Sequence, residues 1–498
     1  MKTAVIVPLI LFASCLSACA TKLPPEKEPS QIQTRLTYRD FYSHASQKLS
    51  VSPNKGETNL LVIPVWFSDS STYILETSKE NVRDDIQKSY FGTTSDVGWE
   101  SVSSFYKKDS FNKVSISGTV SEWYECGKSS TYYYTDSNNS KTVDLVFEAV
   151  NWYEVNNPEV DMKQYDKDSD GYLDGVMLIY AAPDTQAMSK NNPNMWAYCY
   201  WTESSADVLN PQANVFFWAS YDFMYDSVAA KARTGKTSYA GGYCKNGIIL
   251  DTHTYIHEMG HVFGLDDYYD YADEPYLPAG GFSMQDYNVG AHDPFSRLSL
   301  GWVDAYVPTE SSTFVLKPVE TSGQIVVLGN SYDGSPFNEY IILELYSSDG
   351  LNYQDSRYPY GKYPTGPLVR GVRIWHVDAR LIDITDMKNL SITTDIKDGH
   401  KYYVANNNTS SGKRCKTTLA QGAYNLNQLI KNDTKLEYNN RQLLSSENMF
   451  HAGDIFSLKT YQTQFHEKNH LNNGEEFRWT VRFNSANEQG MSISCILD

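Results

Sequence analysis

The sequence predicts an α+β protein, with an α/β layer domain followed by a mostly β, sandwich-like C-terminal region. Two observations lead to this prediction. Helical and strand patterns alternate up to about residue 305, and strand-like segments separated by Gly, Asn, Asp and Ser dominate after it. The length of 498 residues fits two or three domains, and 41% hydrophobic residues suffice for packed cores.

The first half contains three expected strands and three expected helices. Runs of apolar or β-branched residues predict strands at 59–69, 113–124 and 175–182. Helical composition or apolar spacing predicts helices at 78–91, 99–108 and 141–155. This alternation favours an α/β domain over residues 58–305.

The second half, residues 306–498, has a different pattern. Its strand-like stretches are STFVLKPV, GQIVVLGN, EYIILELY, VRGVRIWHVD and FRWTVRFN. Turn residues separate them, which is typical of a β-sandwich. We therefore expect a β-rich domain packed on the first one.

The N-terminus has the features of an export signal over residues 1–18. Its mostly apolar run, residues 3–14, is too short for a comfortable transmembrane helix. The next stretch, LSAC (16–19), resembles the lipobox of bacterial lipoproteins, which implies a lipid on Cys19. Residues 19–57 would then tether the protein to a membrane at the bacterial cell surface. A plain cleaved signal in which Cys19 is incidental is the alternative.

Charge and cysteine content narrow the class of protein. The net charge of −18 argues against nucleic-acid binding, because phosphate backbones are bound by basic surfaces. Five cysteines follow Cys19 in the chain, at positions 126, 199, 244, 415 and 495. They form no CxxC pair, and their odd number leaves at least one unpaired. We expect a monomer.

A histidine motif lies in the stretch THTYIHEMGHVFGLDDYYDY, residues 252–271. On a helix, His257 and His261 share one face, so both imidazoles can reach one metal ion. Glu258 would lie beside the metal and could accept a proton from a zinc-bound water. Gly264 permits a positive φ that turns the chain, which lets Asp267 supply a third ligand. Three ligands and one open position are typical of a catalytic zinc site.

This stretch also allows other interpretations. An ordinary amphipathic helix could carry two half-buried histidines, but the added Gly and Asp at fixed distances make chance agreement rare. His253 is four residues from His257 and is expected to be an outer or surface residue. Asp266 is the competing carboxylate, and its spacing is one residue short.

The motif HEMGHVFGLDD resembles the HExxHxxGxxD/H motif of the metzincin metallopeptidases. The stretches GGFSMQDYNVGAHDPFSRLSLGW and GVRIWHVDARL, with LLVIPVWFSD and SVSSFYKKDSFNKVSISGTV upstream, are similar to immune inhibitor A-type secreted bacterial metallopeptidases. The resemblance covers most of residues 58–385 in scattered blocks. It implies a metzincin-like catalytic domain with a mixed twisted sheet and an active-site helix.

The same resemblance implies roles for individual residues. It implies an endopeptidase acting on protein or peptide substrates, with zinc on His257, His261 and Asp267 and Glu258 as general base. The Met-turn of the clan would be Met284, although Gln285 occupies the position two residues before Tyr287 where that methionine often lies. Tyr287 would steady the oxyanion.

A non-catalytic function is the competing hypothesis. A surface lipoprotein that acts as an adhesin or a glycan-binding or protein-binding module could use such a domain as a scaffold, and 38 Tyr and 10 Trp would suit binding. A degenerate domain would be free to lose the base or a ligand. All four residues are intact here, which favours the enzyme.

A second cation site is predicted in YDKDSDGYLDG, residues 165–175. Asp166, Asp168, Asp170 and Asp174 occupy positions 1, 3, 5 and 9 of an EF-hand calcium loop, and Tyr172 could offer its carbonyl. Met177 stands where the loop requires Glu, so the loop is incomplete. We expect a structural calcium ion; a solvated, Asp-rich turn is the alternative.

Overall fold

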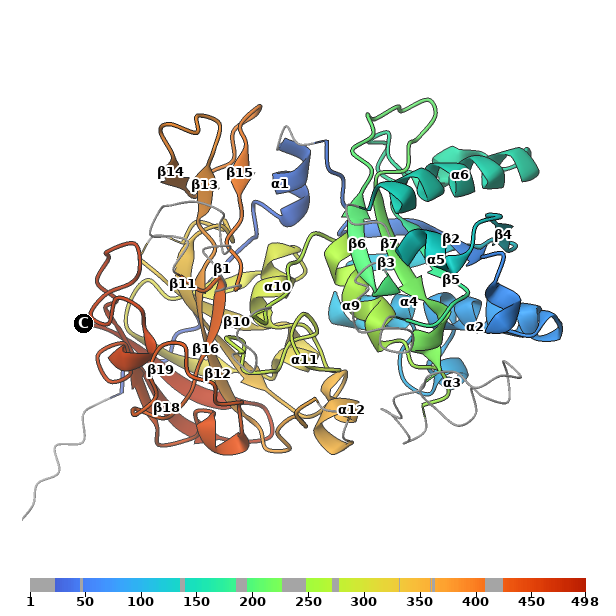
Figure 1. The fold of residues 1–498 in the computed structure, drawn as a ribbon. Helices are drawn as coiled ribbons and strands as arrows, with labels where there is room; N and C mark the ends of the chain where they lie inside the picture. Colours follow the sequence, from blue (N-terminus) through green and yellow to red (C-terminus); the bar gives the residue numbers. More distant parts are fainter. Residues whose placement is uncertain are drawn as a thin grey trace, which may run out of the picture.

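The computed structural model describes residues 23–44, 48–134, 139–184, 195–225, 248–270, 277–330, 332–358, 360, 363–407 and 424–498. It is a mixed α/β structure with several sheets, as the sequence predicts. The α/β half and the β-rich half lie side by side, and helix α9 (His253–Val262) and helix α10 (Pro294–Ser299) lie between them (Figure 1). The predicted signal peptide and Cys19 lie outside the described residues.

The first half is built on one mixed sheet with the strand order β3-β2-β5-β7-β6. Its strands are β2 (Gly56–Trp66), β3 (Val114–Val120), β5 (Val176–Tyr180), β6 (Tyr198–Trp201) and β7 (Val215–Ser220). The short strand β4 (Tyr124–Glu125) extends the pairing of β2. Strand β6 is antiparallel to β7, whereas the other pairs are parallel. The three strands predicted in this half are β2, β3 and β5.

Helices cover both faces of this sheet. Successive side chains of a strand point to opposite faces, so neighbouring residues pack against different helices. Leu60 and Val62 pack with helices α2 (Lys79–Phe91), α4 (Val102–Asp109) and α9. Leu61 and Ile63 pack with helix α6 (Ser140–Asn156) on the other face. The short helices α3 (Thr94–Val97) and α5 (Ser130–Tyr134) complete this half. Helix α9 is thus held against β6 and β7.

The second half contains a six-stranded sheet, β1-β8-β10-β11-β12-β16, and a four-stranded sheet, β17-β18-β19-β9. Their strands are β1 (Ser30–Ile32), β8 (Ala305–Val307), β9 (Ser312–Leu316), β10 (Ile325–Leu328), β11 (Glu339–Tyr346), β12 (Gly371–Asp378), β16 (Asn427–Ile430), β17 (Ile455–Ser457), β18 (Trp479–Ala486) and β19 (Met491–Leu497). A third, small sheet joins β13 (Leu381–Asp383), β14 (Ser391–Thr393) and β15 (Tyr402–Tyr403). Helices α11 (Val319–Ser322) and α12 (Asn352–Arg357) lie between strands in the sequence.

The six-stranded sheet is buried on both faces. Ile341 and Leu343 of β11 pack toward the four-stranded sheet, where both sheets contribute to one hydrophobic core. Tyr340 and Ile342 point the other way and join the core that contains α9 and the first sheet. The boundary predicted at residues 305/306 therefore crosses a shared core, and the two halves are not separately packed bodies.

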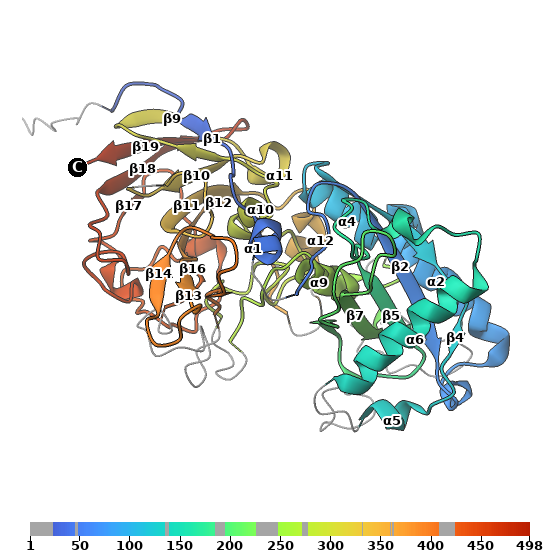
Figure 2. The same cartoon turned by 90° about the horizontal axis from the view of Figure 1, so that it is seen from above.

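The segment predicted as a polar tether, residues 19–57, differs from an extended linker over its described part. Strand β1 pairs antiparallel with β8, and the N–H of Lys27 donates to the carbonyl of Thr313 at 2.9 Å. Helix α1 (Tyr38–His44) buries Tyr38 and Phe41 in the core shared by both halves. Figure 2 shows α1 beside α10, on the side facing α9. Only seven residues make this helix, too few for an apolar periodicity to stand out in the sequence.

Two further expectations concern membranes and cysteines. Within the described residues, no helix combines the length and apolar character that a membrane span requires. Cys126, Cys199 and Cys495 are free thiols. Cys244 and Cys415 lie outside the described residues.

Candidate metal centre

Helix α9 places His257 and His261 on one face and ends at Val262, one residue after the second histidine. The N–H of Gly264 donates to the carbonyl of His261 at 2.8 Å, and the N–H of Leu265 donates to that of Gly260 at 3.0 Å. Gly264 has φ = +98°, which is costly for residues with a Cβ. A Cβ at Gly264 would also lie 2.7 Å from Cε2 of Tyr42, so helix α1 packs directly on this turn.

The turn brings Asp267 back to the two histidines. Oδ1 of Asp267 lies 3.0 Å from Nε2 of His257 and 3.3 Å from Nε2 of His261. All three donor atoms lie within 4.8 Å of one another. Donors at about 2.0–2.1 Å from a tetrahedral ion are about 3.3 Å apart, so this spacing fits a single zinc-sized ion. The three predicted ligands are thus brought together.

Hydrogen bonds to the outer nitrogens orient both imidazoles. Nδ1 of His257 lies 2.7 Å from the carbonyl of Met284, and Nδ1 of His261 lies 2.8 Å from the carbonyl of Leu265. A carbonyl only accepts, so each Nδ1 carries a proton, which leaves each Nε2 as the nitrogen that can bind a metal. Partners of this kind fix the tautomer and ring orientation of metal-binding histidines.

Charge within the group also suits a cation. Burial lowers the pKa of His261, but the carboxylate of Asp267 outweighs it and raises that pKa to about 10. Burial raises the pKa of Asp267, but His261 and His257 outweigh it and hold the carboxyl well below its usual range. Without a metal, a proton shared between these groups therefore balances the carboxylate. A metal ion would take the place of that proton.

Glu258 lies next to this group and has an unused oxygen. Its side chain is buried, and Oε2 has no hydrogen-bond partner among the described residues. Burial raises the pKa of this carboxyl above its usual value. A buried carboxylate oxygen without a partner is costly, so the site is arranged to receive a hydrogen-bond donor there.

The four residues line a pocket of about 500 Å³. Aromatic side chains from three separate segments form much of its wall: Tyr38, Tyr42, Trp196, Tyr198, Trp201 and Tyr269. Tyr42 stacks on Trp201 with ring centroids 6.0 Å apart. These wall residues could not be foreseen from the sequence, because α1, β6 and the motif are far apart in the chain and no spacing links them.

The structure places the other predicted residues of this site as follows. Met284 is fully buried, and its carbonyl binds His257. Tyr287 is not among the residues that line the pocket; its ring packs on Tyr269, which does, with centroids 4.9 Å apart. Asp266 accepts from the N–H of Asp267 at 2.9 Å and is not part of the donor group.

His253 is likewise separate from the donor group. It is buried, and Nε2 lies 2.9 Å from the carbonyl of Asn288. Burial lowers the pKa of His253 to about 3, so this histidine is neutral. It supports the start of α9 as an outer residue.

The acidic loop brings three of its four aspartates together. One carboxylate oxygen each from Asp166, Asp168 and Asp174 lies within 4.8 Å of the others. Asp170 instead accepts from Arg39 of α1 at 2.9 Å, and Arg39 also pairs with Asp168. Burial raises the pKa of Asp174 to about 7.

Arg39 lies in the segment that the sequence predicts to be a tether, so its contact with the loop was not expected. The side-chain hydroxyl of Tyr172, also expected at the loop, donates to the carbonyl of Ser204 at 3.3 Å. An arginine therefore balances part of the negative charge of the described loop, and calcium at this position stays a prediction.

Comparison with known families bears on the pocket and its donors. Residues 56–276 match the family model of the immune inhibitor A peptidase M6 catalytic domain. This match supports a metallopeptidase role. The matched region contains Glu258 and all three donors, and it ends before Met284 and Tyr287. The chain has no significant match among curated proteins.

Asp267 and Asp266 provide a direct test of the metal centre. Asp267→Asn should weaken metal binding by more than the roughly 10- to 100-fold that loss of an outer partner causes, because it removes an anionic ligand. Asp266→Asn, the neighbouring control, should keep the metal. Metal content and affinity of the purified proteins are measured by mass spectrometry and chelator competition. Equal loss in both variants, or in neither, would contradict the assignment.

Proposed function

We propose that the protein is a zinc-dependent endopeptidase in which Glu258 is the general base. The observation that carries this proposal is the convergence of His257, His261 and Asp267 in a pocket that also holds Glu258, whose Oε2 has no hydrogen-bond partner among the described residues. The match of residues 56–276 to a peptidase family supports it.

The residues present divide the work of peptide hydrolysis. His257, His261 and Asp267 would hold the zinc ion, which when bound acts as a Lewis acid toward water and the peptide carbonyl. Glu258 accepts a proton from the attacking water and returns it to the leaving amine. Its buried position and raised pKa suit a group that must both accept and release a proton near neutral pH.

Strand β6 offers a place for an extended peptide. It is the last strand of its sheet in the part of the chain that the structure describes, and Tyr198, Cys199 and Trp201 on it line the pocket. A free strand edge can bind a peptide backbone by β-augmentation, while pockets select side chains. This geometry favours peptide substrates over small molecules.

A metzincin-like arrangement is the finer proposal for the fold. The carbonyl of Met284 beneath His257 supports its role as the Met-turn. Tyr287, packed on Tyr269 at the side of the pocket, would reach the oxyanion only after a side-chain movement.

A binding module is the second candidate, and the aromatic wall of the pocket favours it. Tyr42, Trp201 and Tyr269 could hold a ligand without any reaction. Such a module would have no use for Glu258 as a base.

The Glu258→Gln variant separates the two candidates. It keeps the shape of the side chain but removes the basic oxygen, so we expect full zinc content and a loss of turnover of about 10²–10⁴-fold. Cleavage of unfolded casein is measured beside zinc content and binding of casein. Equal cleavage by both proteins would refute the assignment of the base. Zinc and casein binding without cleavage in the unaltered protein would favour the binding module.

We also propose a structural calcium ion at the acidic loop, supported by the three converging carboxylates of Asp166, Asp168 and Asp174. Calcium that binds only the folded state should raise the midpoint of thermal unfolding. At a calcium concentration of 100 times its Kd, the free energy of unfolding should rise by about 2.7 kcal/mol. Asp168→Asn should lose this response, and the exposed Asp144→Asn should keep it. An unaltered protein that does not respond to calcium would leave Arg39 as the partner that balances the loop.

Attachment to a membrane through a lipid on Cys19 is proposed from the lipobox-like stretch alone. Incorporation of labelled fatty acid in a bacterial host tests it. The unaltered chain should be labelled and Cys19→Ser should not; a label in neither protein would favour a plain cleaved signal.

A further inference from the structure

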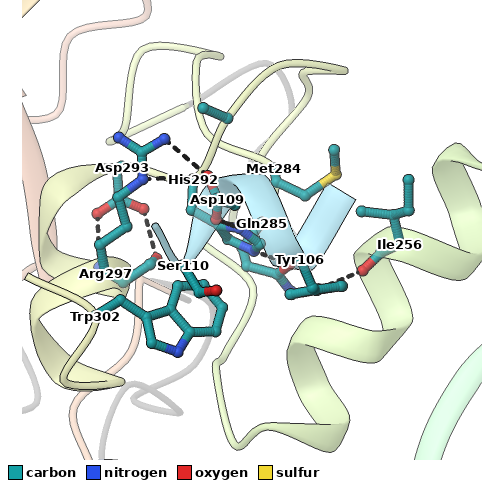
Figure 3. Close-up of polar contacts among 12 residues, drawn as sticks. Tyr106, Asp109, Ser110, Ile256, Met284, Gln285, His292, Asp293, Arg297 and Trp302 are labelled. Atoms are coloured by element: carbon teal, nitrogen blue, oxygen red, sulfur yellow. Dashed lines mark hydrogen bonds and ion pairs between the residues drawn. The ribbon is translucent and has the colours of Figure 1, made fainter. Parts of the chain in front are cut away.

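A network of buried charged and polar side chains lies beside helix α9 (Figure 3). Oδ1 of Asp109, at the end of α4, accepts from Nη2 of Arg297 at 2.7 Å, and Oδ2 lies 2.7 Å from Nδ1 of His292. Arg297 also binds Glu320 at 3.1 Å. The side chains of Asp109, His292 and Arg297 are almost completely shielded from water. The network thus joins α4 and α10 to the start of the second half.

This network continues to the metal ligands through Gln285. Oε1 of Gln285 lies 3.2 Å from Nε2 of His292, and its Nε2 lies 3.4 Å from Nδ1 of His261. Gln285 is completely buried. The preceding residue, Met284, binds His257 through its carbonyl. Two consecutive residues therefore contact both histidine ligands, one by main chain and one by side chain.

The sequence of helix α9 accommodates this amide. A Cβ at Gly260 would lie 2.3 Å from Oε1 of Gln285, a distance that no real contact allows. Glycine in a helix interior costs about 1 kcal/mol relative to alanine. The lack of a side chain at Gly260 lets Gln285 approach the helix backbone closely beside His261.

Proton positions along the chain of contacts are mutually consistent. When Nε2 of His261 faces a metal, Nδ1 carries a proton. The two ends of an amide are alike in size, so Gln285 can turn its oxygen to this N–H, which is shared with the carbonyl of Leu265 at 2.8 Å, and donate from its nitrogen to His292. His292 then donates from Nδ1 to Asp109, which Arg297 keeps charged. Each link from His261 through Gln285 and His292 to Asp109 then joins one donor to one acceptor.

A gain in the stability of the fold does not explain why such a network is present. Taking several charges out of water costs several kcal/mol per ion, and apolar side chains of equal volume often stabilise a core as well or better. What a fully bonded network supplies is fixed geometry.

We propose that Gln285, held by His292 and Asp109, is a positioning residue that sets the orientation of His261 and thereby the affinity of the metal centre. This inference rests on the proposed zinc site. It assigns the buried charges around Asp109 a role at the pocket, although none of them lines it.

Zinc affinity of the full chain is the decisive measurement. Metal-free protein is titrated with zinc against a chromophoric chelator, for the unaltered chain and for Gln285→Met, Gly260→Ala and Tyr106→Phe. Gln285→Met should raise the zinc Kd at least about tenfold, as loss of an outer partner does. Gly260→Ala should also raise it, even though alanine is the better helix former, because the new Cβ displaces the amide.

Tyr106→Phe is the matched control. It removes a hydrogen bond of 2.6 Å from the Tyr106 hydroxyl to the carbonyl of Ile256 on the same helix, but it touches no ligand. Its zinc Kd should stay within about twofold of the unaltered value even if the thermal midpoint of the metal-free protein falls. The visible spectrum of the cobalt-substituted proteins should change for the Gln285 and Gly260 variants and not for this one.

Gln285→Glu guards against a variant that fails to fold, because it keeps the length and an acceptor oxygen toward His261. It should recover most of the affinity that Gln285→Met loses. Unchanged zinc affinity in Gln285→Met and Gly260→Ala, or an equal loss in Tyr106→Phe, would overturn the inference. The unaltered protein shows which proposal such a result contradicts. If it binds zinc and also cleaves casein, only the inference about Gln285 fails. If it binds no zinc, the proposed function fails.

Discussion

The constraint on which the site depends is the turn that follows helix α9. Two histidines on one helical face supply two donors, but the third must come from a chain that reverses within a few residues. Gly264 makes this reversal possible with φ = +98°, and Tyr42 packs where a side chain would otherwise stand. Asp267 then lies 3.0 Å from His257. The candidate metal centre therefore depends on backbone geometry as much as on ligand chemistry.

The two halves of the chain both contribute to holding this turn. One hydrophobic core runs from the first sheet through α9 and α10 to β11 of the second half. Helix α1 belongs to the same core and also forms a wall of the pocket. On the opposite side of α9, the network of Asp109, His292 and Arg297 reaches Glu320 in the second half. The β-rich half is thus part of the support of the site.

Local patterns predicted much of this structure, and contacts between distant residues account for the rest. The apolar run of β2 and the spacing of α6 are local, so both were foreseen; the spacing of His257, His261 and Asp267 predicted their convergence for the same reason. Strand β1 has three residues and forms only through pairing with β8. Arg39 reaches Asp170 across 131 residues of sequence. Six residues separate Gln285 from His292, and no spacing rule links the two side chains, so the network beside α9 could not be foreseen.

The buried charged groups of the site lower the stability of the folded state, which indicates that they serve a function. Glu258 is buried with an oxygen that has no partner among the described residues, and burial raises its pKa. Asp267 is buried between two imidazoles that are neutral in a metal-bound state. Each of these costs the folded state free energy unless a cation and a hydrogen-bond donor occupy the pocket. A protein that used this domain only as a scaffold would gain stability by replacing these groups with apolar ones, so their joint presence supports the proposal of a bound metal ion and an attacking water.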